Sequence, residues 1–181
     1  AKNMRLFIDE CFLDFTGCED ALSLVGKLQK YPGLFILKAF TKMYAMAGVR
    51  LGFGLTADTE LIDRMYQAGP PWNVSILASA AGKAALKEND CVKETMQYIS
   101  KEKEYLYRAL DTLRVRYWKS AANYILLKSD PELKKWLITE GILIRDCSNY
   151  RNLSEGYFRI AVKSHADNEK LIAALKVVLE R

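Results

Sequence analysis

Three charged residues in the first third of the chain have the types and spacing that covalent chemistry on a small anionic molecule requires. Asp9 ends the apolar stretch 5–9 (RLFID), Lys42 follows the apolar stretch 34–37 (LFIL), and Arg50 comes eight residues after Lys42. Open α/β sheets bind ligands at the carboxyl ends of their strands. A lysine amine can act as a nucleophile towards a carbonyl, and a guanidinium makes bidentate contacts to phosphate without losing its charge. The three residues are therefore candidates for a ligand-binding site.

Each residue also has a plainer interpretation. An aspartate at a strand end can be a turn or helix-cap residue, a loop lysine can be solvated surface, and an arginine among glycines can form an ordinary ion pair. Together, however, they match the needs of pyridoxal phosphate (PLP). That cofactor requires a lysine that forms an imine with its aldehyde, an acid that keeps its pyridine nitrogen protonated, and a cation that holds its phosphate.

Four segments carry a family resemblance. The stretch 39–52 (AFTKMYAMAGVRLG) resembles the cofactor-lysine signature of class I/II aminotransferases, and 9–15 (DECFLDF) resembles the aspartate-glutamate-alanine-tyrosine segment of the histidinol-phosphate aminotransferase group. The stretches 70–75 (PPWNVS) and 144–162 (IRDCSNY to GYFRIAV) are similar to later landmarks of that group. Their order and spacing hold over the whole chain.

The resemblance implies roles for residues at matching positions. Asp9 would pair with the pyridine nitrogen, Lys42 would carry PLP, and Arg50 would hold the cofactor phosphate, with Thr41 as a further candidate phosphate ligand. Lys42 and Asp9 are thus the implied catalytic residues.

Two later arginines match substrate-binding positions of the same group. The resemblance implies that Arg159 binds the substrate carboxylate and that Arg145 contacts a substrate phosphate. Two arginines from neighbouring strands can converge on a doubly anionic substrate. The alternative for each is a surface ion pair.

Two positions depart from the family pattern. Phe12 replaces the usual tyrosine, so no hydroxyl reaches the phenolic oxygen of the cofactor, and Ala39 replaces a frequent phosphate-binding serine. The expected activity is that of a histidinol-phosphate aminotransferase-like enzyme, which moves an amino group between an amino acid or amino phosphate and a 2-oxo acid. Phe12 and the spacing from Arg145 to Arg159 lean towards threonine-phosphate decarboxylases, which form the first alternative. The second alternative is a non-catalytic fragment. A nucleotide-binding domain is disfavoured because neither a GxGxxG nor a GxxxxGK[ST] loop is present.

The pattern of apolar residues predicts an α/β protein. It indicates the later part of the PLP-binding large domain of a fold type I transferase (1–102), followed by a smaller α+β domain (103–181), with the boundary inside a long helix. A strand–helix–strand unit opens the chain, and its continuous apolar strands predict a parallel sheet buried on both faces. The expected strands are 5–9, 34–37, 123–127, 142–145 and 157–162, and the expected helices are 19–30, 58–67, 75–88, 90–113, 131–139 and 166–180.

Composition excludes several classes of protein. The 181 residues carry a net charge of +5, but basic and acidic residues alternate, so we expect no nucleic-acid partner. No apolar run is long enough to cross a membrane and no signal peptide is recognisable, which indicates a cytoplasmic protein. The four cysteines and one histidine, His165, predict no metal site, and His165 is interpreted as a capping or surface residue. Relatives of this kind are about twice as long, so we expect a truncated product whose full-length form is a homodimer.

Overall fold

The computed structural model describes residues 4–180 and divides the chain into two compact units. The first unit ends at Thr95 and the second begins at Met96, so the division lies inside helix α4 (Asn89–Thr112). The domain boundary expected from the sequence falls in the same helix. The assignment of 1–102 and 103–181 as separate domains remains a prediction, and each unit is described below by itself.

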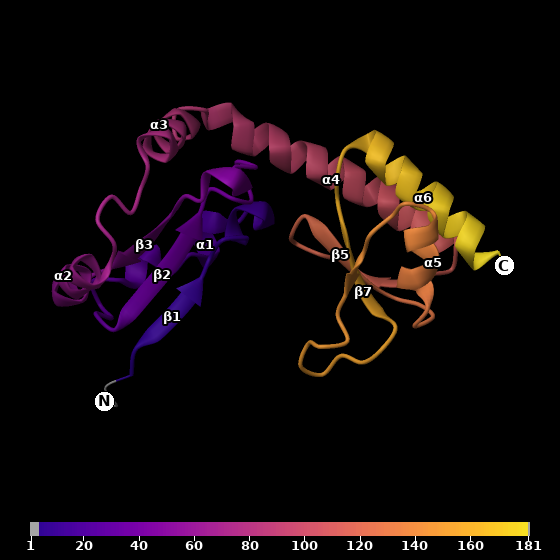
Figure 1. Ribbon diagram of the computed structural model, residues 1–181, viewed down its shortest axis with the longest axis horizontal. Coiled ribbons are helices and arrows are strands. Elements are labelled where there is room, and N and C mark those ends of the chain that lie inside the picture. Colours follow the sequence, from indigo (N-terminus) through magenta and orange to yellow (C-terminus); the bar gives the residue numbers. More distant parts are fainter. Residues whose placement is uncertain (1–3, 181) are drawn as a thin grey trace. The chain divides into compact units, whose positions relative to one another are not determined.

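A three-stranded sheet organises the amino-terminal unit (Figure 1). Strand β1 (Leu6–Asp9) pairs in parallel with β2 (Leu34–Ala39), and β2 pairs antiparallel with β3 (Gly52–Thr56). The strand order is β1-β2-β3. The parallel pair confirms the strand–crossover–strand unit, but the sheet is mixed, because the glycine-rich stretch after Lys42 returns as an antiparallel strand. Since β1 and β2 run in the same direction, the residues that follow them leave from the same edge of the sheet.

The crossover between β1 and β2 differs from the helix expected over 19–30. Helix α1 is only Glu19–Leu22, and the crossover also contains two short 3₁₀ turns, η1 (Leu13–Thr16) and η2 (Val25–Lys27). The cause is a buried carboxylate. Glu10 accepts hydrogen bonds from Ser23 Oγ at 2.8 Å and from the Leu24 backbone N–H at 2.9 Å. These bonds hold the chain at Ser23 in an extended conformation, which ends the helix.

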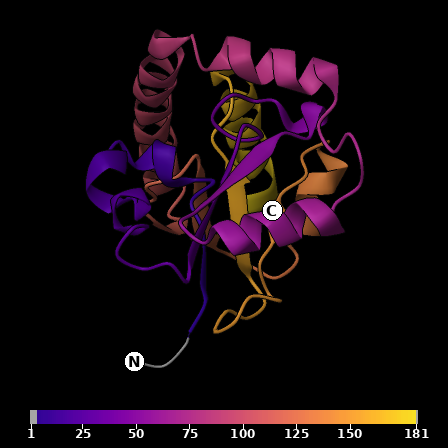
Figure 2. The ribbon, with the colours of Figure 1, turned by 90° about the vertical axis from the view of Figure 1, so that its left-hand side faces the viewer.

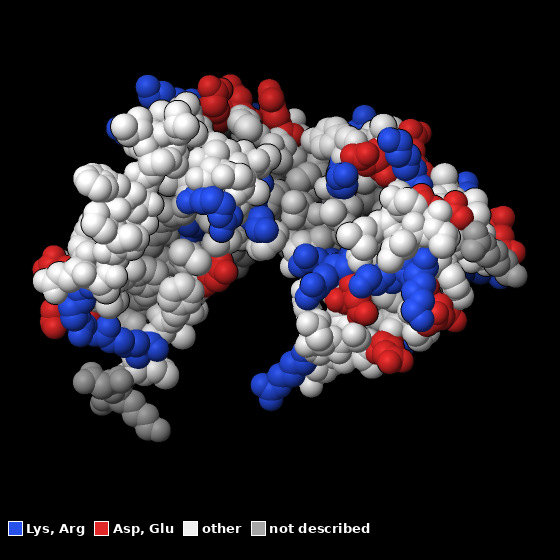
Figure 3. Space-filling model, in the orientation of Figure 1, with Lys and Arg blue, Asp and Glu red and all other residues white. Residues whose placement is uncertain are grey.

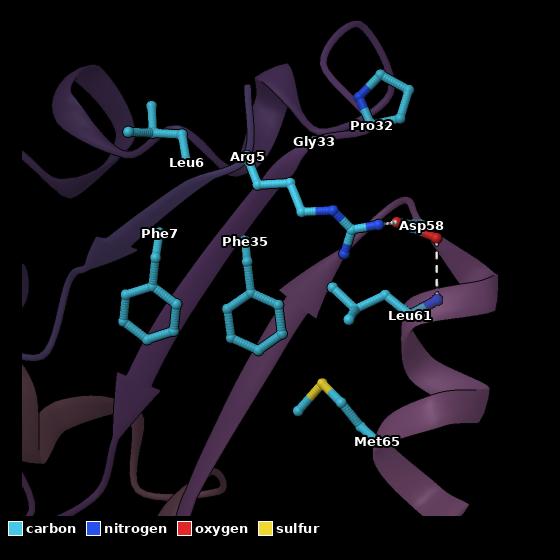
Figure 4. A pocket seen from close by; sticks show the side chains of 9 residues that line it. All are labelled: Arg5, Leu6, Phe7, Pro32, Gly33, Phe35, Asp58, Leu61 and Met65. Carbon is cyan, nitrogen blue, oxygen red and sulfur yellow. Dashed lines mark hydrogen bonds and ion pairs between the residues drawn. The ribbon is translucent and has the colours of Figure 1, made fainter. Parts of the chain in front are cut away.

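Strand β1 is not buried on both faces in this structure. Leu6 and Phe7 remain 46% and 61% exposed. The ring of Phe7 stacks on Phe35 of β2 with centroids 5.3 Å apart (Figure 4), while the other long edge of β1 pairs with no described strand. The apolar side chains of β1 therefore form an exposed surface against which another protein segment could pack.

The helices of the amino-terminal unit begin at side-chain caps. Asp58 accepts the Leu61 N–H at the start of α2, and Ser75 accepts the Ala78 N–H at the start of α3. Helix α2 lies beside the sheet on the β3 side (Figures 1 and 2), and α3 leads into α4. Both helices lie where the sequence predicts them, with bounds Thr59–Ala68 for α2 and Ile76–Ala85 for α3.

The carboxy-terminal unit is an antiparallel four-stranded sheet covered on one face by helices. The strand order is β4-β5-β7-β6, which confirms the expected α+β module. Buried residues of β5 and β7 alternate with half-buried ones, and helices α4, α5 and α6 also contribute buried apolar side chains. Strand β4 is an addition to the predicted elements, and β6 shares only Arg145 with the predicted strand 142–145. The bounds are β4 Arg116–Trp118, β5 Tyr124–Lys128, α5 Leu133–Thr139, β6 Arg145–Asp146, β7 Tyr157–Ala161 and α6 His165–Leu179.

Among residues 4–180, none of the helices combines the length and the apolar character that a membrane span requires.

Candidate active site

The connection between β2 and β3 presents Lys42. Its two ends are tied together where the Phe40 N–H donates to the Leu51 carbonyl at 3.2 Å. Phe40 and Met43 are 5% and 4% exposed, so they anchor the turn in the core on either side of Lys42. Lys42 itself is exposed and Thr41 is half-buried. The local structure thus offers the lysine amine to a ligand while its neighbours hold the backbone.

Asp9 lies at the end of the adjacent strand and is electrostatically coupled to Lys42. Its Oδ1 accepts the Cys11 N–H at 2.9 Å. The side chain of Cys11, the backbone bond from Cys11 and the positive charge of Lys42 lower the pKa of the Asp9 carboxyl against an opposing effect of burial. Asp9 is therefore an ionised carboxylate at neutral pH, close enough to Lys42 to feel its charge. Asp9 ends β1 and Lys42 follows β2, its parallel neighbour, so both residues lie at the carboxyl ends of paired strands.

Phe12 contacts the same lysine. The Lys42 Nζ lies 5.2 Å from the centroid of the Phe12 ring, within the range of a cation–π interaction. The residue that departs from the family pattern thus belongs to the surroundings of Lys42.

Arg50 lies on the same connection as Lys42, at its other end. It is exposed, and its Nη1 donates to the Ala47 carbonyl at 3.2 Å. Arg50 and Ala45 both have positive φ, 57° and 53°, an uncommon backbone conformation for residues other than glycine. Such strain tends to occur at functional sites. Position 52 requires a glycine, because a Cβ there would lie 2.9 Å from the carbonyl oxygen of Lys38.

A charged network that the sequence reasoning missed supports the segment carrying Asp9. Lys38 of β2 is largely buried and lies 3.7 Å from both Glu10 and Asp14, and it also pairs with Glu19. Burial alone would lower the pKa of Lys38, but the hydrogen bond and charge of Glu19, together with the charges of Asp14 and Glu10, raise it. The network ties the segment that follows β1 to β2. A lysine within an otherwise apolar strand was the available signal.

The carboxy-terminal unit places two predicted substrate arginines opposite each other. Arg145 of β6 and Arg159 of β7 are direct partners in the antiparallel register. Each guanidinium lies over an aromatic ring, Arg159 over Tyr124 at 4.7 Å and Arg145 over Tyr150 at 5.9 Å. Within residues 4–180, neither arginine forms an ion pair with a carboxylate. Like charges directly opposite on neighbouring strands are destabilising, so an anion between them would be favourable.

The charges of these arginines also reach an interior cysteine. Cys147 is buried beside the end of β6, and burial raises the pKa of its thiol although Arg159 and Arg145 oppose the change. All four cysteines are free.

In the space-filling view, uncharged residues cover much of the visible face of the amino-terminal unit, whereas Lys and Arg side chains are frequent on the carboxy-terminal unit (Figure 3).

His165, at the first position of α6, is a partner of a buried acid. Ser164 caps the helix, and His165 Nδ1 lies 3.1 Å from both carboxylate oxygens of Glu102. The side chain of His165 is half exposed. This position agrees with a structural residue at the surface.

The predicted site residues thus fall into two groups, with Asp9, Thr41, Lys42 and Arg50 in the first unit and Arg145 and Arg159 in the second. An apolar pocket of about 270 Å³ in the first unit contains none of them (Figure 4). It lies where β1 and β2 begin, between Phe7, Phe35 and Met65, with the Arg5–Asp58 ion pair at its rim. The pocket lies at the opposite end of the strands from Asp9.

Comparison with known proteins places these features in a family. The model of the family "Aminotransferase class I and II" matches residues 1–175. The chain belongs to this family. This aminotransferase-family chain is 37% identical over 181 residues to a threonine-phosphate decarboxylase of Salmonella typhimurium, covering 98% of the chain and 49% of that protein. It is 32% identical over 187 residues to a histidinol-phosphate aminotransferase of Methanosphaera stadtmanae, covering 99% of the chain and 50% of that protein.

Solved structures confirm the fold of this aminotransferase-family chain. The histidinol-phosphate aminotransferase of Clostridium acetobutylicum superposes with a TM-score of 0.90 at 33% identity, over 99% of the chain and 55% of that structure. The L-threonine-O-3-phosphate decarboxylase of Porphyromonas gingivalis superposes with a TM-score of 0.82 at 27% identity, over 97% of the chain and 55% of that structure. The predicted fold type I architecture is therefore correct. The chain spans about half the length of the curated relatives it matches.

Proposed function

We propose that the full-length protein is a PLP-dependent enzyme that acts on an amino acid or amino phosphate, with Lys42 as the residue that bears the cofactor. The observation that carries this proposal is the pair at one edge of the first sheet. The positive charge of the exposed Lys42 favours the ionised form of Asp9, and Arg50 lies with Lys42 on the connection between β2 and β3. A related histidinol-phosphate aminotransferase from Sinorhizobium meliloti was crystallised with pyridoxal-5'-phosphate, and its fold resembles this one with a TM-score of 0.85.

The residues fit the chemistry of PLP. A carboxylate whose pKa is lowered suits a protonated ring nitrogen, because that nitrogen keeps its proton beside a fixed negative charge. The amine of Lys42 is accessible. Arg50 is exposed and, among residues 4–180, forms no ion pair that would compete with a phosphate. When bound, PLP supplies an electron sink for negative charge that develops at the α-carbon of a substrate.

Each side chain then has a defined task. Lys42 would provide the covalent attachment point, and its amine could move a proton to and from the substrate. Asp9 would hold the ring nitrogen in its charged form, and Arg50 would hold the phosphate through charge-assisted hydrogen bonds. Thr41 is placed next to Lys42 as a second candidate for the phosphate.

The arginines of the second unit support a proposal for the substrate class. Arg145 and Arg159 are opposite each other in register, and each guanidinium lies over an aromatic ring. We assign the substrate carboxylate to Arg159 and a substrate phosphate to Arg145. Such a pair suits a doubly anionic substrate, as phosphorylated amino acids and amino phosphates are.

Amino-group transfer of the histidinol-phosphate aminotransferase type is the primary assignment. Decarboxylation of an amino-acid phosphate is the second candidate, favoured by Phe12 near Lys42 and by the 37% identity to a threonine-phosphate decarboxylase. We further propose that the remainder of the full-length protein covers the exposed face of β1, and that the whole protein is a cytoplasmic homodimer.

Borohydride reduction of the full-length protein with PLP tests the assignment of Lys42. Peptide mapping should find the pyridoxyl group on Lys42, and Lys42→Ala should remove the label while the circular dichroism spectrum stays unchanged, because the side chain is exposed. Lys83, an exposed lysine of α3, provides the matched control, since Lys83→Ala should keep the label. A label on another lysine would refute the assignment.

A product assay separates the two activities. Histidinol phosphate and threonine phosphate are supplied separately, each with and without 2-oxoglutarate. Glutamate that forms only when 2-oxoglutarate is present indicates transfer, whereas carbon dioxide release from threonine phosphate without 2-oxoglutarate indicates decarboxylation.

A further inference from the structure

Glu10, the residue after Asp9, is buried and contacts two other parts of the amino-terminal unit. It is 5% exposed, and each of its carboxylate oxygens accepts one hydrogen bond, Oε2 from Ser23 Oγ at 2.8 Å and Oε1 from the Leu24 backbone N–H at 2.9 Å. The Nζ of Lys38 in β2 lies 3.7 Å from the same carboxylate. The Glu10 side chain thus joins the end of β1 to the crossover and to the neighbouring strand.

The backbone of Glu10 is fixed as well. Its N–H donates to the Leu37 carbonyl of β2 at 2.9 Å, and its carbonyl accepts the Leu13 N–H at 3.0 Å, where η1 begins. Successive side chains of an extended chain point to opposite sides. Because Glu10 is turned inward, the preceding side chain is turned outward, and Asp9 is exposed. The burial of Glu10 therefore selects the side on which the Asp9 carboxylate lies.

We infer that Glu10 is a positioning residue, whose buried carboxylate holds the turn after β1 so that Asp9 presents its own carboxylate at the sheet edge where Lys42 also lies. Cys11 completes this turn, since its backbone N–H donates to Asp9 Oδ1 at 2.9 Å. The inference rests on the proposed function for the ligand that Asp9 meets, the ring nitrogen of the cofactor. The hydrogen bonds of Glu10 themselves need no ligand.

Amide hydrogen exchange in the 181-residue chain, read by NMR, tests the inference. The Cys11 N–H reports whether the Asp9 carboxylate is in place. The Leu61 N–H is the matched reference, because it donates to another aspartate oxygen, Asp58 Oδ1, at the same distance of 2.9 Å in the same unit. In Glu10→Ala, exchange at Cys11 should accelerate about ten- to a hundredfold relative to exchange at Leu61, because two hydrogen bonds to a charged group no longer hold the turn.

Glu19→Gln is the matched control. Glu19 also pairs with Lys38, but its side chain is 46% exposed, so its loss should leave the ratio of the two exchange rates nearly unchanged. Ser23→Ala removes one bond to Glu10 from 13 residues away and should raise the ratio by a smaller factor than Glu10→Ala. If Glu10→Ala does not fold, Ser23→Ala decides the matter.

Three results would overturn the inference. One is an unchanged ratio in Glu10→Ala and Ser23→Ala. Another is equal acceleration at Cys11 and Leu61, which would show a general loss of stability and no particular hold on Asp9. The third is a change in Glu19→Gln as large as that in Glu10→Ala.

The full-length protein gives a second measurement, the Kd for PLP read from its visible absorbance. Glu10→Ala should bind PLP more weakly than Glu19→Gln and the parent, because a displaced Asp9 no longer stabilises the charged ring nitrogen. Borohydride should still place the pyridoxyl group on Lys42 in all three proteins. Equal Kd values would overturn the inference. Absence of the label from Lys42 in the parent would instead refute the proposed function and leave the exchange result, which involves no PLP, to decide the role of Glu10.

Discussion

Replacing Arg159 by glutamine should separate anion binding from folding in the carboxy-terminal unit. Arg159 faces Arg145 in register, and like charges directly opposite cost about 0.2–1 kcal/mol. In water, two unit charges about 5 Å apart repel by about 0.8 kcal/mol before salt screening. Against this, the ring of Tyr124, 4.7 Å from the guanidinium, contributes about 0.5–1 kcal/mol. The two effects nearly cancel, so the free energy of unfolding without anions should change by less than about 0.5 kcal/mol.

Added phosphate should reveal the function of the pair. A ligand present at a hundred times its Kd stabilises a protein by about 2.7 kcal/mol, and the parent chain should gain stability in this way while Arg159→Gln loses most of the gain. Urea unfolding, followed by the fluorescence of Trp118 and Trp136, measures the effect. A Trp72→Phe background removes the signal of the other unit, where Trp72 is 94% exposed. Chloride replaces phosphate at equal ionic strength in the reference samples.

Lys128→Gln is the matched control. Lys128 faces Arg116 in the same sheet and lies over the ring of Tyr157 at 4.9 Å, so it shares both the like-charged partner and the aromatic contact. This variant should keep the gain from phosphate. If Arg159→Gln destabilises the anion-free chain by more than about 2 kcal/mol, the arginine is structural and our reasoning fails. A gain from phosphate that survives in Arg159→Gln would equally refute it.

Two further outcomes concern stability. Burial would raise the pKa of Glu102, but hydrogen bonds from Asn168 and His165 outweigh this effect and lower the pKa. Glu102 therefore stabilises the fold above its ordinary pKa of 4.5, and this contribution is lost as the pH falls through the pKa that Glu102 has in the folded protein. Glu102→Gln should therefore be less stable at pH 7 and lose less stability on acidification, as urea titrations between pH 7 and pH 3 will show; parallel losses in parent and variant would contradict this. Gly54→Ala should cost about 1–3 kcal/mol, because the new Cβ would lie 2.1 Å from the ring of Phe35, whereas Gly48→Ala meets nothing within 4 Å and should be nearly neutral. Equal thermal midpoints for the two glycine variants would show that the ring moves aside.

The local signals in the sequence predict most of this protein well. Helices α2, α3 and α6 begin where Asp58, Ser75 and Ser164 supply caps, because capping depends on a few adjacent residues. The family and the order of its motifs follow from residue types at given spacings, and comparison with known proteins confirms them. The roles of Lys42 and Arg159 remain predictions, since spacing along the chain identifies candidates but does not show what they bind.

Tertiary structure decided the features that depend on partners distant in sequence. Helix α1 ends at Leu22 because the Glu10 carboxylate accepts a hydrogen bond from the backbone N–H of Leu24. The helical periodicity of the sequence cannot reveal this contact. The exposure of β1 has a similar origin, since an apolar strand is buried only where another element covers it. Arg145 and Arg159 are 14 residues apart in the chain but become direct neighbours through the antiparallel register of β6 and β7. Residue types determine which chemistry is possible, whereas pairing across strands determines which charges meet, because hydrogen-bond register and packing set those distances.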